Sequence, residues 1–257
     1  MRCSMAQARL SGQAPIRTGV DTRAQAPSES LAGADALPGD LLMTLRLLAL
    51  PLIAVLAACQ NPADEGGAGV TEETLPKAVI ETDMGEIRIV LHAGKAPVSV
   101  ANFLAHVEAG TFEGGSFYRV VRDDNDRPDI ENPMNLIQGG WGFEGLPEAQ
   151  GIAHESTDMT GLSHVRGAVS MGRYDVGTAT TEFFIMLNDT PGLDAGPDGR
   201  NPGDEAGYAV FGQVVEGIEI AEAIMNGAAG GHEGAPEGFA HQFLTEPVTI
   251  RSIRRVR

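Results

Sequence analysis

The alternation of apolar and polar residues marks where the folded part of the chain begins. Alternating residues at 78–82 and again at 87–91 flank the turn residues 83–85. A two-residue period interrupted by a short turn is the pattern of an antiparallel β-hairpin. We therefore expect a folded domain that opens with this hairpin at Lys77.

Two segments have the period of amphipathic helices. The first has Pro97 in its first turn, where proline is tolerated, and ends before Gly110. The second covers 216–225 and precedes Gly227, and glycine commonly follows the last turn of a helix. The apolar residues at helical spacing in the first segment are Val100, Phe103, Leu104 and Val107.

Short runs rich in β-branched and aromatic residues account for most of the remaining pattern. They lie at 117–121, 167–171, 183–187, 208–214 and 248–256. Many short strands with only two helices predict a mainly β domain, built as a closed antiparallel barrel.

The residues before this domain do not have the pattern of a folded unit. Residues 1–42 mix small and polar residues, so we expect them to be disordered or to precede the true start of translation at Met43. Residues 43–58 place Arg46 before a short apolar run, which is typical of a secretory signal peptide. Residues 59–76 are rich in Gly, Ala, Glu and Thr and are predicted to form a flexible tether.

The alternative for residues 47–56 is a buried core helix. It fits less well, because Arg46 precedes the run and a polar, glycine-rich segment follows it. The run is also too short for a membrane-spanning helix, which needs about 20 apolar residues.

The end of the signal resembles the lipoprotein box of bacterial signal peptides. Residues 56–59 read Leu-Ala-Ala-Cys, and the resemblance implies that Cys59 becomes the lipidated first residue of the mature protein. Gln60 follows it, which in such lipoproteins favours the outer membrane over the inner one. We expect an exported, periplasmic protein that is anchored to the cell envelope through several acyl chains, since one chain binds a membrane only marginally.

Cysteine content excludes a disulfide in the mature domain, and net charge argues against one class of partner. The two cysteines are Cys3 and Cys59, and Cys3 precedes the expected start, so the mature domain must fold without a disulfide. The formal net charge is −17. Nucleic acid is therefore not expected as a partner, because phosphate binding requires a basic surface.

Five short motifs in the second half of the chain resemble the cyclophilin family of peptidyl-prolyl cis-trans isomerases, in a bacterial version. They are Phe-Tyr-Arg-Val-Val at 117–121, Ile-Gln-Gly-Gly at 137–140, Ser-Met-Gly at 170–172, Glu-Phe-Phe-Ile at 182–185 and Tyr-Ala-Val-Phe-Gly at 208–212. The resemblance covers 77–257. It implies an eight-stranded barrel with a helix over each end, isomerisation of Xaa-Pro bonds, and no cofactor.

The resemblance also implies roles for individual residues. Arg119 would be the catalytic donor, held by Gln138, which would also contact the substrate backbone. The positions matching a proline pocket are Leu136, Phe184 and Leu193. The positions matching the rest of the substrate groove are Gly172 and Arg173 through their backbone, Glu182, and Tyr208 as a wall. The alternative for each is ordinary structure, such as a surface arginine or a core phenylalanine.

Three positions and two loops depart from the family's pattern. Glu182 stands where glutamine is common, Asn135 where phenylalanine is common, and Gly192 where many members have tryptophan. Segments 122–133 and 194–206 read as long insertions, and loops of that length are often functional or mobile. A second hypothesis is therefore a proline-peptide binding module or chaperone with weakened catalysis.

Other chemistry has little support in the sequence. The six histidines show no metal-ligand spacing, so no metal is expected. Ser163 and Ser170 lack the context of a nucleophile elbow, which argues against a hydrolase. We expect a monomer that binds proline-containing polypeptides and assists the folding of exported proteins.

Overall fold

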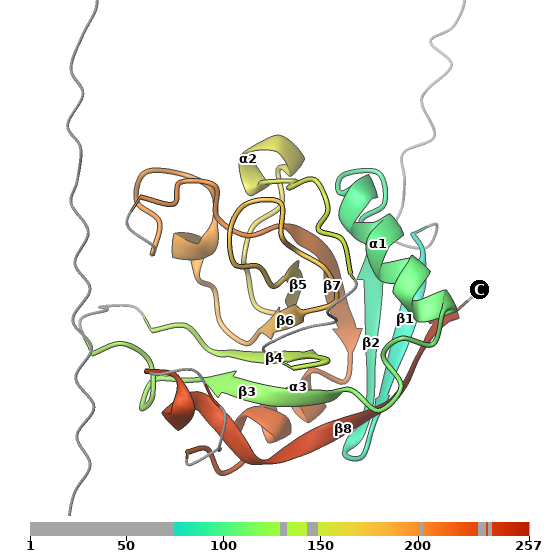
Figure 1. The fold of residues 1–257 in the computed structure, drawn as a ribbon, viewed down its shortest axis with the longest axis vertical. Coiled ribbons are helices and arrows are strands. Elements are labelled where there is room, and N and C mark those ends of the chain that lie inside the picture. Colours follow the sequence, from blue (N-terminus) through green and yellow to red (C-terminus); the bar gives the residue numbers. More distant parts are fainter. Residues whose placement is uncertain are drawn as a thin grey trace, which may run out of the picture. The chain divides into compact units, whose positions relative to one another are not determined.

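Eight antiparallel strands form a closed barrel in this computed structural model, in the order β1-β2-β7-β5-β6-β4-β3-β8 (Figure 1). The structure describes residues 75–256 except 129–132, 143–148, 201–202, 231–234 and 236–237. The strands are β1 (Lys77–Thr82), β2 (Gly85–Leu91), β3 (Ser116–Val121), β4 (Leu136–Gly140), β5 (Ala168–Met171), β6 (Phe183–Met186), β7 (Val210–Glu216) and β8 (Phe243–Val256). The mainly β barrel expected from the sequence is confirmed.

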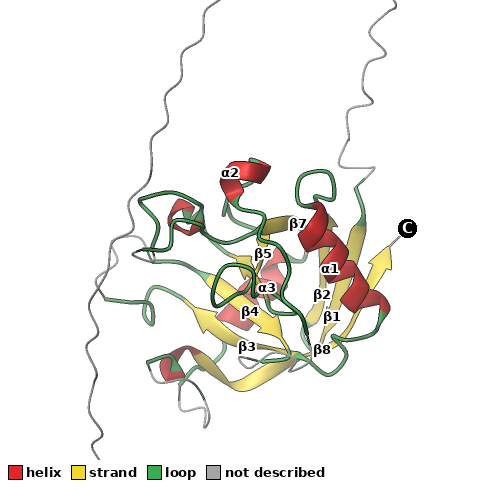
Figure 2. Cartoon of the chain, turned by 45° about the horizontal axis from the view of Figure 1, so that its top comes forward, coloured by secondary structure: helices red, strands yellow, loops and turns green. Residues whose placement is uncertain are grey.

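Three α-helices, rather than the two predicted, occur among the described residues. They are α1 (Pro97–Glu108), α2 (Thr157–Thr160) and α3 (Ile218–Met225). The first and third match the predicted helices, whereas the single turn of α2 is too short to produce a helical period. Short 3₁₀ turns cover Pro191–Leu193 and Ala240–Gln242. Figure 2 shows long loop segments gathered on the side of the barrel that carries α2.

Helix α1 begins at Pro97 without a capping side chain of its own. Its first amides are instead satisfied by a distant carboxylate. Glu155 accepts from the Val98 amide at 2.9 Å, and from the Ser99 amide at 2.8 Å and hydroxyl at 2.7 Å. A carboxylate at a helix N-terminus also complements the helix dipole. This contact fastens the loop before α2 to α1.

Strand β4 was not among the runs read as strands. Two of its five residues are glycines, which have low β propensity. The glycines are required by packing, since a Cβ at Gly139 would lie 2.7 Å from the Phe117 ring, and Gly140 has φ +146°. Close approach of the backbone therefore replaces the usual strand signal.

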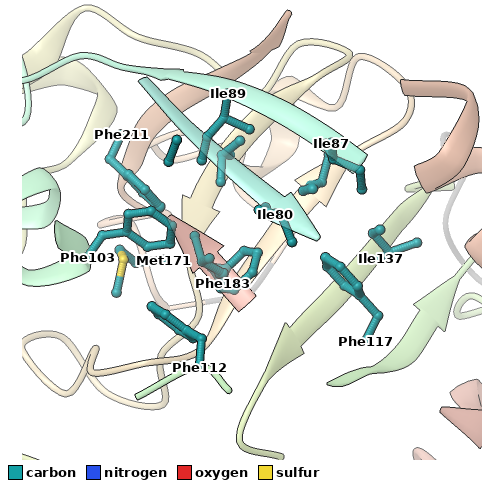
Figure 3. Packing of buried hydrophobic residues seen from close by; sticks show 14 of the residues in the cluster. Ile80, Ile87, Ile89, Phe103, Phe112, Phe117, Ile137, Met171, Phe183 and Phe211 are labelled. Atoms are coloured by element: carbon teal, nitrogen blue, oxygen red, sulfur yellow. The ribbon is translucent and has the colours of Figure 1, made fainter. Parts of the chain in front are cut away.

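The barrel interior is filled by aromatic and branched side chains (Figure 3). Phe103 of α1 packs against Phe112, Phe183 and Phe211, with ring centroids 5.2 to 5.8 Å apart. Such tilted and edge-to-face pairs are the favoured arrangement of aromatic rings. Helix α3 adds Ala221 and Ile224 to the same core. The two longer helices are therefore fixed to the barrel by apolar burial.

The predicted leader 1–42, signal peptide 43–58 and nearly all of the tether 59–76 lie outside the described residues. Within the described part of the chain, no helix combines the length and apolar character needed to cross a membrane.

Candidate active site

Arg119 and Gln138 lie directly opposite each other on the antiparallel strands β3 and β4. Side chains at such paired positions are close enough to interact. Arg119 Nη1 donates to Gln138 Oε1 at 2.7 Å. On its other side, Gln138 is paired with Phe184 of β6. The register therefore places a guanidinium, an amide and an aromatic ring in one row across three strands.

Apolar residues next to this row form a second cluster, separate from the barrel core. We call it the outer cluster; it contains Val121, Leu136, Ala168, Phe184, Met186, Leu193 and Val210, with Tyr208 packed against it. Along β4 and β6, Ile137 and Ile185 point into the core, so their neighbours face outward. This alternation puts Leu136 and Phe184 on the same face as Gln138. Leu193, from the 3₁₀ turn, and Tyr208, from the loop before β7, join them by packing in the outer cluster.

A second glutamine, Gln242, holds the opposite edge of the Arg119 guanidinium. Its Oε1 accepts from Arg119 Nε at 2.9 Å and Nη2 at 2.6 Å. The Phe239 ring covers Arg119, with the guanidinium carbon 5.2 Å from the ring centroid. Burial lowers the pKa of the Arg119 guanidinium from its ordinary value. Gln242 and Phe239 were not predicted, because they lie outside the five motifs.

Glu182 is linked to Arg119 through two intermediates and not directly. Its carboxylate accepts from the Tyr118 hydroxyl at 2.7 Å and from the Trp141 amide at 2.8 Å. Gln138 Nε2 in turn donates to the Tyr118 oxygen at 2.7 Å. Among the described residues, no ion pair joins Glu182 to Arg119. Glu182 therefore neither orients Arg119 nor draws it away from the substrate by direct contact.

Burial is the largest cause of the pKa shifts of Glu182 and Tyr118. Glu182 is 8% exposed, and burial raises the pKa of its carboxyl to about 7, against the opposing effect of its hydrogen bonds. Burial, followed by the nearby Glu182 charge, raises the pKa of the Tyr118 hydroxyl. The site therefore contains one acid that titrates near neutral pH.

A buried histidine, His164, packs against two aromatic residues of the outer cluster, Phe184 and Tyr208. The His164 ring lies nearly parallel to Phe184, with centroids 5.9 Å apart, and edge-on to Tyr208. Its Nδ1 is 2.6 Å from Asp194 Oδ1, and its Nε2 is 3.0 Å from Ser170 Oγ. Because the Asp194 carboxylate only accepts, Nδ1 donates to it, and in the neutral ring Nε2 accepts a hydrogen bond from the Ser170 hydroxyl.

This Ser-His-Asp relay has the connectivity of a hydrolase triad, which the sequence did not reveal. Ser170 and His164 are both fully buried, so a substrate cannot reach the hydroxyl. Burial acts to raise the pKa of the Asp194 carboxyl, but hydrogen bonds from His164 and Ser163 outweigh it and lower that pKa. The relay therefore fixes the ring that packs on Phe184.

Gly172 and Arg173 lie beside Glu182 and Tyr208. The Gly172 amide donates to the Glu182 carbonyl at 2.7 Å. The Arg173 guanidinium lies over the Tyr208 ring, 5.0 Å from its centroid, and binds both carboxylate oxygens of Asp204 at 2.8 and 3.0 Å. The Arg173 side chain is thus occupied in holding the second insertion to the wall of the site.

The structure brings the predicted site residues of 119–208 into one region, although their roles in binding and catalysis remain predictions. The predicted lipidation residue, Cys59, lies outside the described residues. Asn135, one of the departures, has a buried Oδ1 without a hydrogen-bond partner in the described part of the chain. In the same part, no group of three His, Cys, Asp or Glu side chains is arranged to hold a metal ion.

Comparison with known proteins identifies the family of the chain. Residues 77–255 match the family model for cyclophilin type peptidyl-prolyl cis-trans isomerase/CLD. The chain is 32% identical to a peptidyl-prolyl cis-trans isomerase of Acinetobacter baylyi, over 74% of this chain and 91% of the relative. It is 29% identical to peptidyl-prolyl cis-trans isomerase A of Dickeya dadantii, over 84% of this chain and all of the relative.

A solved structure supports the fold independently. The crystal structure of a cyclophilin type isomerase from Cryptosporidium parvum superposes with a TM-score of 0.53 at 19% identity, covering 71% of this chain and 98% of that one. At this identity the likeness concerns the fold alone. Taken with the family match over 77–255, the barrel and its motifs show that this chain belongs to the cyclophilin-type peptidyl-prolyl cis-trans isomerase family.

Proposed function

We propose that this protein accelerates rotation about Xaa-Pro peptide bonds with Arg119 as the donor that stabilises the twisted bond. The observation that carries the proposal is the fixed guanidinium of Arg119 beside the outer cluster, joined to it through Gln138. Apolar side chains suit a proline ring, and a rigid cation next to them suits the peptide nitrogen.

The chemistry requires no nucleophile, metal or proton carrier. Amide resonance sets a barrier of about 18–20 kcal/mol to rotation, and an uncatalysed Xaa-Pro bond exchanges over tens to hundreds of seconds. When the bond twists, resonance is lost and the nitrogen regains a lone pair. A donor that meets this lone pair stabilises the twisted state more than either planar isomer, which is the condition for catalysis.

Two neutral acceptors hold Arg119 without cancelling its charge. Gln138 and Gln242 both contact it through amide oxygens. A carboxylate in either place would form an ion pair and compete with the substrate for the guanidinium. Because Glu182 bonds to Tyr118 instead, the acidic departure at this position leaves Arg119 available.

The isomerase function is tested with a peptide in which cleavage by an added protease requires the trans Xaa-Pro bond. The purified protein should raise the rate of the slow cleavage phase in proportion to its concentration. Measurable binding of unfolded chains without any rate increase would favour the weakened binding module. The matched family consists of isomerases, which favours catalysis over that alternative.

We also propose that the protein acts in the periplasm, anchored to the cell envelope through lipid on Cys59, where it assists the folding of exported proteins. The apolar run after Arg46 and the Leu-Ala-Ala-Cys sequence at 56–59 support this proposal. Mass analysis of the native N-terminus tests it. A lipidated Cys59 is expected, and an unmodified chain starting at Met1 or Met43 would contradict it. Cys59→Ser should release the protein from the membrane fraction.

A further inference from the structure

Gln242 makes more hydrogen bonds to Arg119 than the predicted partner Gln138 does. One Gln242 oxygen accepts from both Nε and Nη2, at 2.9 and 2.6 Å, while Gln138 receives one bond from Nη1 at 2.7 Å. The two amides therefore grip opposite edges of the guanidinium. An arginine carries five N–H groups, and these bonds use three of them.

Gln242 is itself fixed on both sides. Its side chain is buried, with 4% exposure for the residue, and its Nε2 donates to the Asn125 carbonyl at 2.9 Å. The orientation of the amide follows from its partners, because Arg119 can only donate and the Asn125 carbonyl can only accept. Rotating the amide by half a turn would lose every one of these bonds.

The anchor of Gln242 belongs to the first loop insertion. Asn125 is buried, its Oδ1 accepts from the Arg122 amide at 2.8 Å, and its Nδ2 donates to the Val120 carbonyl at 3.2 Å. The insertion therefore folds back onto the end of β3, the strand that carries Arg119. Near its start, the Asn125 carbonyl accepts from Gln242 Nε2.

We propose that Gln242 is a positioning residue for Arg119, anchored by the first insertion through Asn125. The inference rests on the proposed role of Arg119 as the catalytic donor. A flexible arginine side chain must be held in one geometry if it is to stabilise the twisted bond, since a small displacement of a catalytic group lowers the rate strongly. Gln242 supplies that restraint from a segment 123 residues away in sequence.

The test replaces Gln242 by methionine, which keeps the length of the side chain and removes the acceptor. We expect kcat to fall between about tenfold and about 100-fold with little change in KM, because the restraint acts on the twisted state. Gln242→Asn keeps the amide but withdraws it by one carbon and should lower kcat in the same way with less disturbance of the fold. Gln213→Met is the matched control, since Gln213 lies on β7 and bonds to the Arg166 carbonyl; it should leave kcat unchanged.

Combination with Arg119→Ala separates positioning from structure. If Gln242 acts through Arg119, Gln242→Met should have no further effect on kcat in the Arg119→Ala background. An equal loss in both backgrounds, or a loss that follows only the unfolded fraction in a thermal melt, would overturn the inference. Full activity of Gln242→Met alongside a large loss in Arg119→Ala would overturn it while leaving the proposed function intact. Full activity of Arg119→Ala would instead reject the proposed role of that arginine.

Discussion

Asp126 and Arg200 form a buried ion pair that joins the two loop insertions. Arg200 Nη2 donates to Asp126 Oδ2 at 2.6 Å, and the two side chains are 7% and 2% exposed. The Arg127 side chain adds a bond to the Arg200 carbonyl at 2.7 Å, and the Arg200 amide donates to the Gly192 carbonyl at 2.8 Å. The two insertions are thus bonded to each other and to Gly192, which is next to the predicted pocket residue Leu193.

Removing one partner of this pair should destabilise the domain. Asp126→Ala removes the carboxylate that faces the buried Arg200 guanidinium, and breaking comparable buried pairs costs about 3–5 kcal/mol. The double variant with Arg200→Met should recover much of the loss, because it removes both charges. Urea unfolding measures both free energies. Strictly additive losses in the double variant would show that the two side chains are not energetically coupled.

Glu182 should make the stability of the domain depend on pH near neutrality. Its pKa is raised to about 7 in the folded protein from 4.5, so the folded state binds more protons than the unfolded state between these values. The free energy of unfolding therefore decreases as pH rises through this window and levels off above it. Relative to wild type, Glu182→Gln should gain stability between pH 4.5 and 8, by a change on the order of 3 kcal/mol. Parallel stability profiles for the two proteins would contradict this assignment.

The His164 relay should contribute to both stability and substrate affinity. His164→Leu leaves the Ser170 hydroxyl without its buried partner, a loss that costs about 1–3 kcal/mol. It also removes the ring stacked on Phe184, so KM for a proline peptide should rise more than kcat falls. Thermal unfolding and steady-state kinetics measure the two effects. The control is His106→Leu on α1, where the half-buried histidine has a long hydrogen bond of 3.4 Å to Thr111 and an edge-on contact with the Phe112 ring. A larger loss in the control would contradict the role of the relay.

The barrel could be predicted from the sequence because its signals are local. Apolar residues recur every two residues in the hairpin of β1 and β2, and about every four residues along the buried face of α1. Strand β4 was not predicted, because close packing requires Gly139 and a positive φ favours Gly140. These requirements leave no periodic pattern in the sequence. The first part of β8, residues 243–247, was also missed, since the strand begins at Phe243 and the predicted run begins at 248.

The site was predictable only where a motif carried it. Arg119 and Gln138 lie in motifs and meet across adjacent strands. Gln242 and Arg200 come from segments without a motif, and their partners lie 123 and 74 residues away. Contacts over such separations depend on how loops fold back on the barrel, which no local pattern encodes. Glu182 was identified as a site residue, but its hydrogen-bond partner Tyr118 was not. The sequence does not show that Tyr118 lies between Glu182 and Arg119.

The central claim, that Arg119 stabilises the twisted Xaa-Pro bond, is tested most directly by kcat/KM of Arg119→Ala in the protease-coupled assay. Loss of one fixed donor to a developing charge typically lowers the rate by about 100-fold to 1,000-fold, and we expect a decrease of that size with an unchanged thermal melt. The kcat/KM of Arg119→Lys should lie between those of wild type and Arg119→Ala, since a lysine keeps the charge but not the planar geometry held by two glutamines. An Arg119→Ala protein that isomerises the peptide as fast as wild type would contradict the account.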